Sequence, residues 1–211
     1  MTTRITCNTM FRTAQIQQSC GAKSAGPLSG KQLVIWGWSR SSIAANGAHV
    51  HVGVDRNTLE HADIIILGGH HYTHYHHPER FLHGNQTLNL NRYVQPSNPI
   101  KGRKLVVITG CLGTNDRAMK YFRKRFPHSI VIGAAGSSRG KLSGLFVQFL
   151  ADIKAGRVKI SHCPSSDALA KAFVAYARAK NVTIGSGIGV FDAAANRRVR
   201  IQGASTTCHA Y

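Results

Sequence analysis

The chain has 211 residues, of which 43% are apolar, so it is long enough for one good-sized domain with a full core and short for two. No apolar run approaches the roughly 20 residues that span a bilayer, which excludes a transmembrane segment. Lys and Arg number 27 against 8 Asp and Glu, a formal net charge of +19. Such a chain attracts polyanions, and we expect contact with nucleic acid through its basic surface. The basic residues are scattered and accompany no known nucleic-acid-binding motif, so this contact is not expected to be the main function.

Five cysteines are present: Cys7, Cys20, Cys111, Cys163 and Cys208. Their number is odd, their spacing is wide, and no CxxC pair occurs. The pattern therefore indicates neither a zinc finger nor a disulfide framework. A reducing compartment is the simpler interpretation, and we expect a cytoplasmic protein.

Residues 1–30 contain no acidic residue and are broken by Gly26 and Pro27, which predicts a loosely ordered arm or an extra edge element. From residue 31 to 211 the pattern is that of a single α/β domain. Residues 32–38 read as a buried strand, 49–54 as a half-buried strand and 57–61 as a short helical turn. The β-branched run at 63–67 is typical of a strand that is covered on both faces.

A polar stretch with a hairpin-like segment at 86–94 follows, and then residues 104–109 form an apolar strand that ends at Gly110 and Cys111. Residues 114–116 offer N-cap chemistry for a basic helix that Pro127 stops. Residues 129–135 are another buried strand, helices are expected at 141–155 and 167–180, and short strands with a glycine-rich turn at 185–189 complete the chain. Strands that alternate with helices predict a mostly parallel sheet with helices on both faces.

Two of the predicted strands run into chemically reactive side chains. The strand at 63–67 leads into Gly68, Gly69, His70 and His71, and the strand at 104–109 leads into Cys111. Functional groups gather at the carboxyl ends of strands in open parallel sheets. If these two strands are neighbours, an imidazole and a thiol lie side by side at one edge of the sheet.

That pairing is the arrangement that thiol catalysis requires. A free thiol is mostly protonated at neutral pH, and a nearby imidazolium or helix N-terminus favours the reactive thiolate. The helix that begins near Thr114 follows Cys111 closely enough to contribute. The imidazole would then protonate the leaving amine of a cleaved peptide bond.

The order of these elements resembles the caspase-like (clan CD) cysteine peptidases, and most of all their CHAT branch. In that family a hydrophobic strand ends in Gly-His, and some 40 residues later a second one ends in Cys. The run LVVITGCLG at residues 105–113 and the following order of helix, strand, small-residue loop and long helix are similar to the family's pattern over roughly residues 31–180. The resemblance implies a three-layer α/β/α sandwich.

The resemblance also implies roles for individual residues. Cys111 matches the nucleophile and His70 the acid/base, and the backbone N–H groups of Cys111 and His71 would form the oxyanion hole. The family usually has Gly after the His where this chain has His71, so His71 is an alternative to His70 as the catalytic imidazole, although we favour His70. The implied partners are a protein substrate and a regulatory protein, because small bacterial relatives often act as regulated effectors, for example in antiviral (anti-phage) defence.

Substrate selection stays open in the sequence. Asp116 or Asp152 could select a basic residue before the cut, and Arg139 or Arg117 an acidic one, whereas each of them also reads as an ordinary surface charge. The loop at 84–104, with Arg92, Arg103 and Lys104, is a candidate for self-cleavage. Neither the family pattern nor the sequence calls for a cofactor.

Rival interpretations have weaker support. A histidine cluster could bind zinc or copper, but no HExxH pattern is present, so we expect no metal; its members are His70, His71, His74, His76, His77 and His83. Residues 109–113 faintly resemble the nucleophile elbow of glutamine amidotransferases, in which a Cys follows a strand. In that family the His follows the Cys in sequence, whereas the Gly-His strand here precedes it. The glycine-rich run 133–140 lacks the spacing of a phosphate loop. A non-enzymatic alternative is a basic module that binds nucleic acid or a partner and carries a vestigial dyad.

Overall fold

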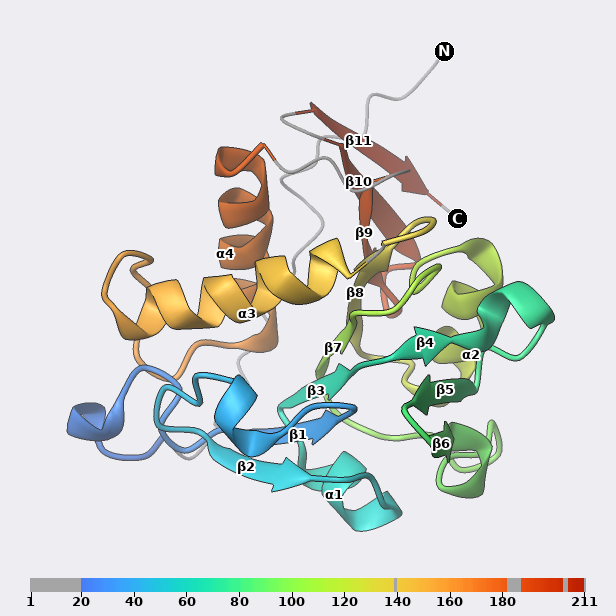
Figure 1. The fold of residues 1–211 in the computed structure, drawn as a ribbon, viewed down its shortest axis with the longest axis horizontal. Coiled ribbons are helices and arrows are strands. Elements are labelled where there is room, and N and C mark those ends of the chain that lie inside the picture. The colour runs from blue at the N-terminus through green and yellow to red at the C-terminus, as the bar shows by residue number, and fades with distance from the viewer. Residues whose placement is uncertain (1–19, 139, 182–186, 203–204, 211) are drawn as a thin grey trace.

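A computed structural model describes residues 20–138, 140–181, 187–202 and 205–210, without the side chains of 74, 75 and 205–210. Its main feature is an eight-stranded sheet in the order β11-β10-β9-β8-β7-β3-β1-β2 (Figure 1). The strands are β1 (Gln32–Trp36), β2 (His49–Val52), β3 (Ile64–Leu67), β7 (Leu105–Ile108), β8 (Ile130–Ala134), β9 (Ile188–Asp192), β10 (Arg197–Gln202) and β11 (Ser205–Ala210). Pairing is parallel from β2 to β8 and antiparallel from β8 to β11.

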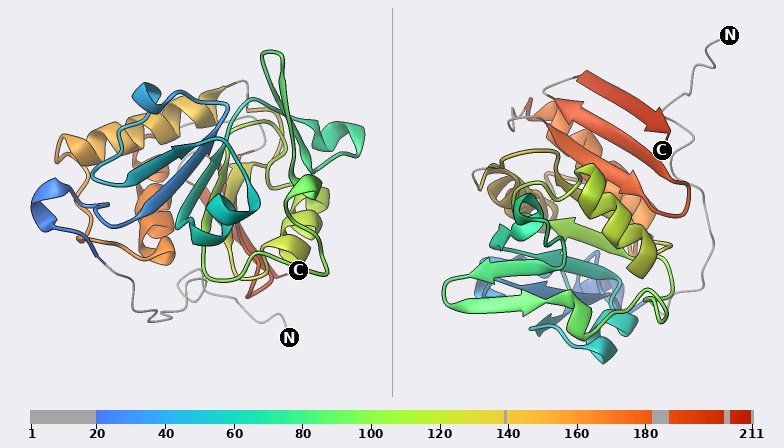
Figure 2. Two further views of the ribbon diagram at one scale, coloured as in Figure 1. Left: turned by 90° about the horizontal axis from the view of Figure 1, so that it is seen from below. Right: turned by 90° about the vertical axis from the view of Figure 1, so that its right-hand side faces the viewer.

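Helices cover both faces of this sheet (Figures 1 and 2). They are α1 (Arg56–His61), α2 (Asp116–Arg125), α3 (Lys141–Lys154) and α4 (Ser166–Ala179), with short 3₁₀ turns η2 (Lys23–Ala25), η3 (Arg40–Ser42), η4 (Tyr72–Tyr75) and η5 (Leu90–Arg92). Side chains of α3 and α4 share one apolar core with the sheet, and those of α1 and α2 share the other. The predicted three-layer α/β/α sandwich is therefore confirmed. None of the helices in the described ranges has the length and apolar content needed to cross a membrane.

Strand β3 shows why the sequence builds a sheet that is covered on both sides. All four of its residues are buried. Ile64 and Ile66 lie in the core beneath α3 and α4, whereas Ile65 and Leu67 lie in the core beneath α1 and α2. Successive side chains of a strand point to opposite faces, so only an unbroken apolar run satisfies both cores.

The helix starts also follow local sequence signals. The Asn115 side chain accepts a hydrogen bond from the backbone N–H of Ala118 at 2.8 Å and caps α2, and the Ser165 hydroxyl caps α4 in the same way at Ala168. Such caps satisfy N–H groups that the helix itself leaves unbonded.

The polar stretch after β3 forms a second sheet with the order β4-β5-β6. It consists of β4 (His70–His71), β5 (Arg80–His83) and β6 (Gln86–Asn89). The hairpin therefore spans residues 80–89, and the expectation of a hairpin at 86–94 is wrong, because the chain turns at Gly84 and enters η5 after Asn89. The glycine-rich turn at 185–189 lies mostly outside the described residues.

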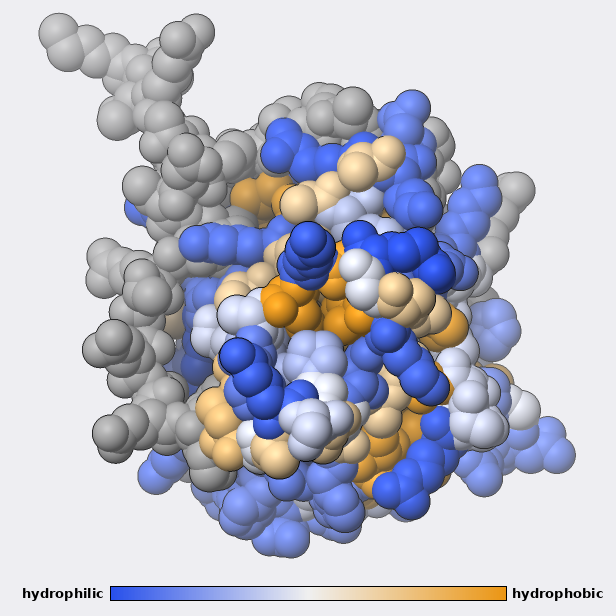
Figure 3. Space-filling view, turned by 90° about the vertical axis from the view of Figure 1, so that its left-hand side faces the viewer, coloured by the Kyte–Doolittle hydropathy of each residue, from blue (hydrophilic) through white to orange (hydrophobic). Residues whose placement is uncertain are grey.

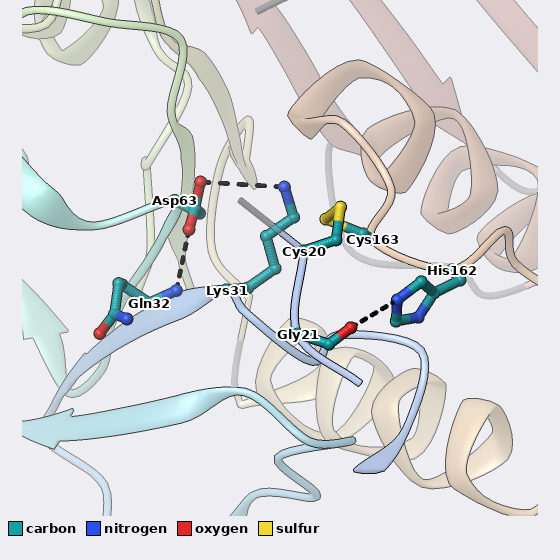
Figure 4. Close-up of a disulfide and its surroundings, with 7 residues drawn as sticks. All are labelled: Cys20, Gly21, Lys31, Gln32, Asp63, His162 and Cys163. Atoms are coloured by element: carbon teal, nitrogen blue, oxygen red, sulfur yellow. Dashed lines mark hydrogen bonds and ion pairs between the residues drawn. A yellow bond between two sulfur atoms is a disulfide. The ribbon is translucent and has the colours of Figure 1, made fainter. Parts of the chain in front are cut away.

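The structure corrects the expectation that the cysteines form no disulfide. Cys20 and Cys163 are bonded to each other, although 143 positions separate them (Figure 4). The imidazole of His162 donates a hydrogen bond to the carbonyl of Gly21 at 3.0 Å beside this disulfide. Disulfides persist mainly in oxidising compartments. The expectation of a reducing, cytoplasmic environment thus loses the observation on which it depended.

The described part of the N-terminal segment, residues 20–30, is packed onto the domain. Leu28 is fully buried in the core beneath α3 and α4. The carbonyl of Pro27 accepts a hydrogen bond from the N–H of Cys163 at 2.8 Å. The prediction of a loosely ordered arm is therefore wrong for residues 20–30. The rest of the predicted arm, residues 1–19, lies outside the described residues.

A buried cluster of charges joins three distant segments. The guanidinium of Arg103 lies 2.7 Å from Asp167 at the start of α4 and 2.8 Å from Asp192 at the end of β9. The neighbouring Lys104 is buried and donates to the carbonyl of Glu60 at 2.6 Å. Arg103 and Lys104 are therefore structural, which corrects their interpretation as an exposed cleavage site.

We expect the substitution Arg103→Met to lower the free energy of unfolding by about 3–5 kcal/mol, because it leaves two buried carboxylates without their cation. Urea denaturation of the purified chain measures this loss. Arg178→Met, at an exposed position of α4, is the matched control and should change stability by less than about 0.5 kcal/mol. Equal effects of the two substitutions would contradict the structural role of Arg103.

The Cys20–Cys163 disulfide should add about 2–4 kcal/mol of stability, because it closes a long loop in the unfolded chain. Non-reducing peptide mapping should recover Cys20 and Cys163 in one linked fragment. A reductant should lower the melting temperature of the wild-type chain but not that of the double variant Cys20→Ser/Cys163→Ser. Unlinked peptides from the oxidised protein would contradict this pairing.

Candidate active site

A cleft with a volume of about 630 Å³ lies at the carboxyl ends of the parallel strands. Parallel pairing places Leu67 of β3 opposite Ile108 of β7, so the segments that leave these two strands start side by side. Both predicted reactive residues line the cleft. Its lining residues are Gly37, Trp38, Ser39, Ser42, Gly69, His70, Leu82, His83, Gly84, Thr109, Gly110, Cys111, Ser138, Gly140 and Ser143.

Cys111 is partly exposed, and among the cysteine side chains that the structure describes it is the one outside a disulfide. Its Sγ accepts a hydrogen bond from the backbone N–H of Ser138 at 3.4 Å, and the hydroxyls of Ser137 and Ser138 lie 3.8 and 3.9 Å away. Hydrogen bonds to sulfur stabilise the charged form of a thiol. Ser138 was not predicted to have a role, because residues 133–140 match no motif that binds or activates a thiol.

Two helices begin near the thiol: α2 is close to it in sequence, and α3 begins at the cleft that the thiol lines. The α2 helix begins at Asp116, after the turn that follows Cys111, as the sequence predicts. The start of α3 borders the cleft itself, because Gly140 and Ser143 line it. The positive end of a helix dipole favours an anion within the first turn. The position of the α3 N-terminus at the cleft was not predicted from the sequence.

The backbone around Cys111 is tightly constrained. A Cβ atom on Gly110 would lie 2.6 Å from the carbonyl oxygen of Gly69 and 3.0 Å from the backbone nitrogen of His71, so only glycine fits there. Leu112 has φ = +57°, a left-handed conformation that is strained for a leucine. Its N–H donates to the carbonyl of Gly136 at 2.8 Å and holds this turn in place.

The two candidate histidines point in opposite directions, as neighbours on a strand do. His70 is exposed and lines the cleft, whereas the side chain of His71 is buried and stacks on Phe81 at a ring distance of 4.4 Å. In His71, Nδ1 lies 3.3 Å from the carbonyl oxygen of Cys111 and Nε2 lies 2.9 Å from that of Pro78. His71 therefore braces the segment that carries Cys111, and its ring does not line the cleft as a catalytic imidazole would.

Burial sets the protonation state of His71. Loss of solvation lowers the pKa of its imidazole from 6.5 to about 4, against the opposing effect of the carbonyls of Pro78 and Cys111. The ring is thus neutral at physiological pH. A neutral ring carries one N–H and donates to one of these carbonyls at a time.

Three of the charged residues proposed for substrate selection, Asp116, Arg117 and Asp152, do not line this cleft. Asp116 is exposed, lines a separate hollow and lies 3.4 Å from Arg198. Arg139 is outside the described residues. Asp152 is buried and accepts hydrogen bonds from Arg157 and Tyr176, and the bond from Arg157 is the main cause that lowers its pKa to about 2.

A metal site is a further alternative that the sequence suggested. No group of three or more His, Cys, Asp or Glu side chains in the described ranges is arranged to hold a metal ion. His77 lies 3.0 Å from Glu79, which makes an ordinary surface pair. The cleft itself offers a thiol, an imidazole and hydroxyls, and this set of groups suits nucleophilic chemistry.

The buried His71 predicts a pH dependence of stability. Its pKa is lower in the folded chain than in the unfolded chain, so the unfolded chain binds more protons between about pH 6.5 and pH 4. Stability should therefore fall as the pH falls through this window, by up to about 3 kcal/mol from this one group. Urea denaturation at several pH values should show a smaller pH effect in His71→Gln than in the wild type or in the exposed-site control His70→Gln. A wild-type pH dependence in His71→Gln would contradict the account.

Comparisons with known proteins give no match. No protein-family model, no curated protein and no solved structure is significantly similar to the chain. The assignment of a function therefore depends on the geometry of the cleft and on the chemistry of the residues that line it.

Proposed function

We propose that the chain is a cysteine endopeptidase that uses Cys111 and His70 to cleave a protein substrate. The observation that supports it most is that a partly exposed thiol and an exposed imidazole line one cleft at the ends of the adjacent strands β3 and β7. This agrees with the roles that the resemblance to caspase-like peptidases implies for these two residues.

The proposed reaction begins with attack of the Cys111 thiolate on the carbonyl carbon of the substrate peptide bond. The C–N bond breaks, His70 transfers a proton to the leaving amine, and a thioester links the substrate acyl group to Sγ. Water then attacks the thioester with His70 as the base, which releases the acid product and restores the thiol.

Backbone geometry supports an oxyanion site at the same place. The close approach of Gly110 to Gly69 and His71 brings the N–H-bearing segments of His71 and Cys111 next to each other. We assign these two N–H groups to the oxyanion hole, where each preorganised donor contributes about 3 kcal/mol to transition-state stabilisation. His71 acts here as a positioning residue through its contact with the carbonyl of Cys111.

The described lining of the cleft carries no carboxylate and no Lys or Arg side chain. Trp38, Leu82 and several small residues form much of its wall instead. We propose that Trp38 and Leu82 contact an apolar part of the substrate. Arg139, which lies outside the described residues, stays a candidate for selecting an acidic residue before the cut. A regulatory protein partner and a role as an effector in antiviral defence belong to the same proposal, through the family resemblance alone.

Cleavage of an unstructured protein such as casein tests the proposal. Wild-type chain should generate new termini, which mass spectrometry detects, and Cys111→Ala should generate none. The activity of His70→Gln should fall by about 10²–10⁴-fold. His83→Gln, which removes the other exposed histidine of the cleft, is the matched control and should keep most activity. Identical fragments from wild type and Cys111→Ala would contradict the proposal.

Alkylation distinguishes the proposed peptidase from the alternative, a binding module with a vestigial dyad. In a peptidase, iodoacetamide should modify Cys111 faster than it modifies an ordinary exposed thiol, and His70→Gln should slow that reaction. Slow labelling that is the same in both proteins would favour the binding module.

A further inference from the structure

A second hollow, with a volume of about 440 Å³, lies at the start of α2, a few residues after Cys111. Its lining residues are Asn115, Asp116, Arg117, Ala135, Arg198 and Arg200. We call it the arginine hollow. Three of its six lining residues are arginines and only one is acidic. This composition points to an anionic ligand, because guanidinium groups match the oxygens of phosphates and carboxylates.

Strand β10 fixes two of these arginines. Arg198 and Arg200 are two positions apart and therefore lie on one face of the strand, while Val199 and Ile201 fill the core on the other face. Nη1 of Arg198 donates to the carbonyl of Thr114 at 3.1 Å, which orients its guanidinium beside the start of α2. Within the described part of the chain, the buried Nε of Arg200 makes no hydrogen bond. A buried donor of this kind costs free energy until an acceptor reaches it.

Helix α2 extends the positive surface beyond the hollow. Apart from Asp116 at its first position, the exposed residues of α2 are basic: Arg117, Lys120, Arg123 and Lys124. Arg123 donates to the side chain of Asn196 at 3.1 Å, which holds α2 against the turn between β9 and β10 (Figure 2). We call α2 and β10 together the α2/β10 face. Its basic residues lie both in the hollow and along α2, so a single small anion would contact only some of them. We therefore expect a ligand that carries several negative charges.

The distribution of carboxylates strengthens the field of this face. Asp116 is the only acidic residue that lines the hollow. Most other acidic residues of the chain face basic partners elsewhere: Glu60 faces Arg56, Asp63 faces Lys31, Glu79 faces His77 and Arg80, Asp152 faces Arg157, and Asp167 and Asp192 face Arg103. On the α2/β10 face Asp116 lies 3.4 Å from Arg198, and the described basic side chains there still outnumber this one carboxylate.

The chemistry of the face favours nucleic acid over an acidic protein. Protein interfaces have an apolar core, whereas nucleic-acid interfaces are polar and strongly positive. The arginine hollow contains no large apolar residue. Figure 3 shows apolar residues among hydrophilic ones on the side of the molecule that is at the left in Figure 1. The one large apolar side chain found highly exposed among the described residues, Val52, lies on β2 at the far edge of the sheet.

We propose that the α2/β10 face binds the phosphodiester backbone of nucleic acid, with phosphate groups seated in the arginine hollow. The contact is independent of base sequence, because charge and guanidinium–phosphate hydrogen bonds carry no sequence information. It is also independent of the proposed peptidase chemistry.

Fluorescence anisotropy with a labelled DNA duplex and the full chain tests this site. Lys120→Gln/Arg200→Gln should weaken binding by about tenfold at low salt and reduce the slope of log K against log salt by about 1.8, or about 0.9 for each lost phosphate contact. Lys154→Gln/Arg178→Gln removes the same charge from exposed positions of α3 and α4 and should change both quantities much less. Cys111→Ala should bind DNA like the wild type whether or not the chain is a peptidase.

A variant that should bind DNA more tightly provides a second test. Asp116→Asn removes the only carboxylate of the hollow and should tighten DNA binding several-fold. Asp116 and Lys120 are exposed, so Asp116→Asn and Lys120→Gln alone still decide the question if Arg200→Gln impairs folding. Equal losses from the α2/β10 and the control pair would overturn the proposal. So would displacement of DNA by polyglutamate of the same charge as efficiently as by unlabelled DNA, which would assign the face to an acidic protein.

Discussion

Parallel pairing of β3 with β7 is the constraint on which the candidate site depends. The register sets Leu67 opposite Ile108, so both strands end at the same level of the sheet. The glycines that follow then allow close approach of the two emerging segments, since a side chain on Gly110 would collide with Gly69 and His71. A slip of this register would carry the thiol and the imidazole apart, and neither α3 nor the loop that holds Ser138 could restore the cleft.

Much of the fold could be predicted because its signals are local. Apolar runs such as residues 64–67 require cover on both faces, and the cap at Asn115 together with Pro127 bounds α2. The expectation that His70 and Cys111 lie at one edge of the sheet follows from the same logic, because each directly follows a buried strand. The structure places both residues in one cleft.

Other features depend on contacts between distant segments, which no local pattern reveals. The Cys20–Cys163 disulfide spans 143 positions, and the Arg103 cluster joins residues 64 and 89 positions away. Ser138 gave no sign of its bond to sulfur. The choice between His70 and His71 required knowing that they form a short strand, because only then does alternation send one ring into the cleft and the other into the core.

The chain thus combines two surfaces of different character that one short turn connects. The cleft is neutral over its described lining and contains the thiol, whereas the arginine hollow is strongly basic. Residues 112–115 connect Cys111 to the start of α2 and include the strained Leu112 and the cap of α2. The same turn therefore positions the proposed nucleophile and one wall of the proposed nucleic-acid site.

The central claim is that the imidazole of His70 acts directly on the sulfur of Cys111. Ultraviolet difference absorbance between the wild-type chain and Cys111→Ala, followed across neutral pH, measures the thiolate at this one position. The account predicts a substantial thiolate signal near pH 7 that His70→Gln diminishes and His71→Gln largely preserves. A protonated thiol at neutral pH, with the same titration in His70→Gln as in the wild type, would contradict it.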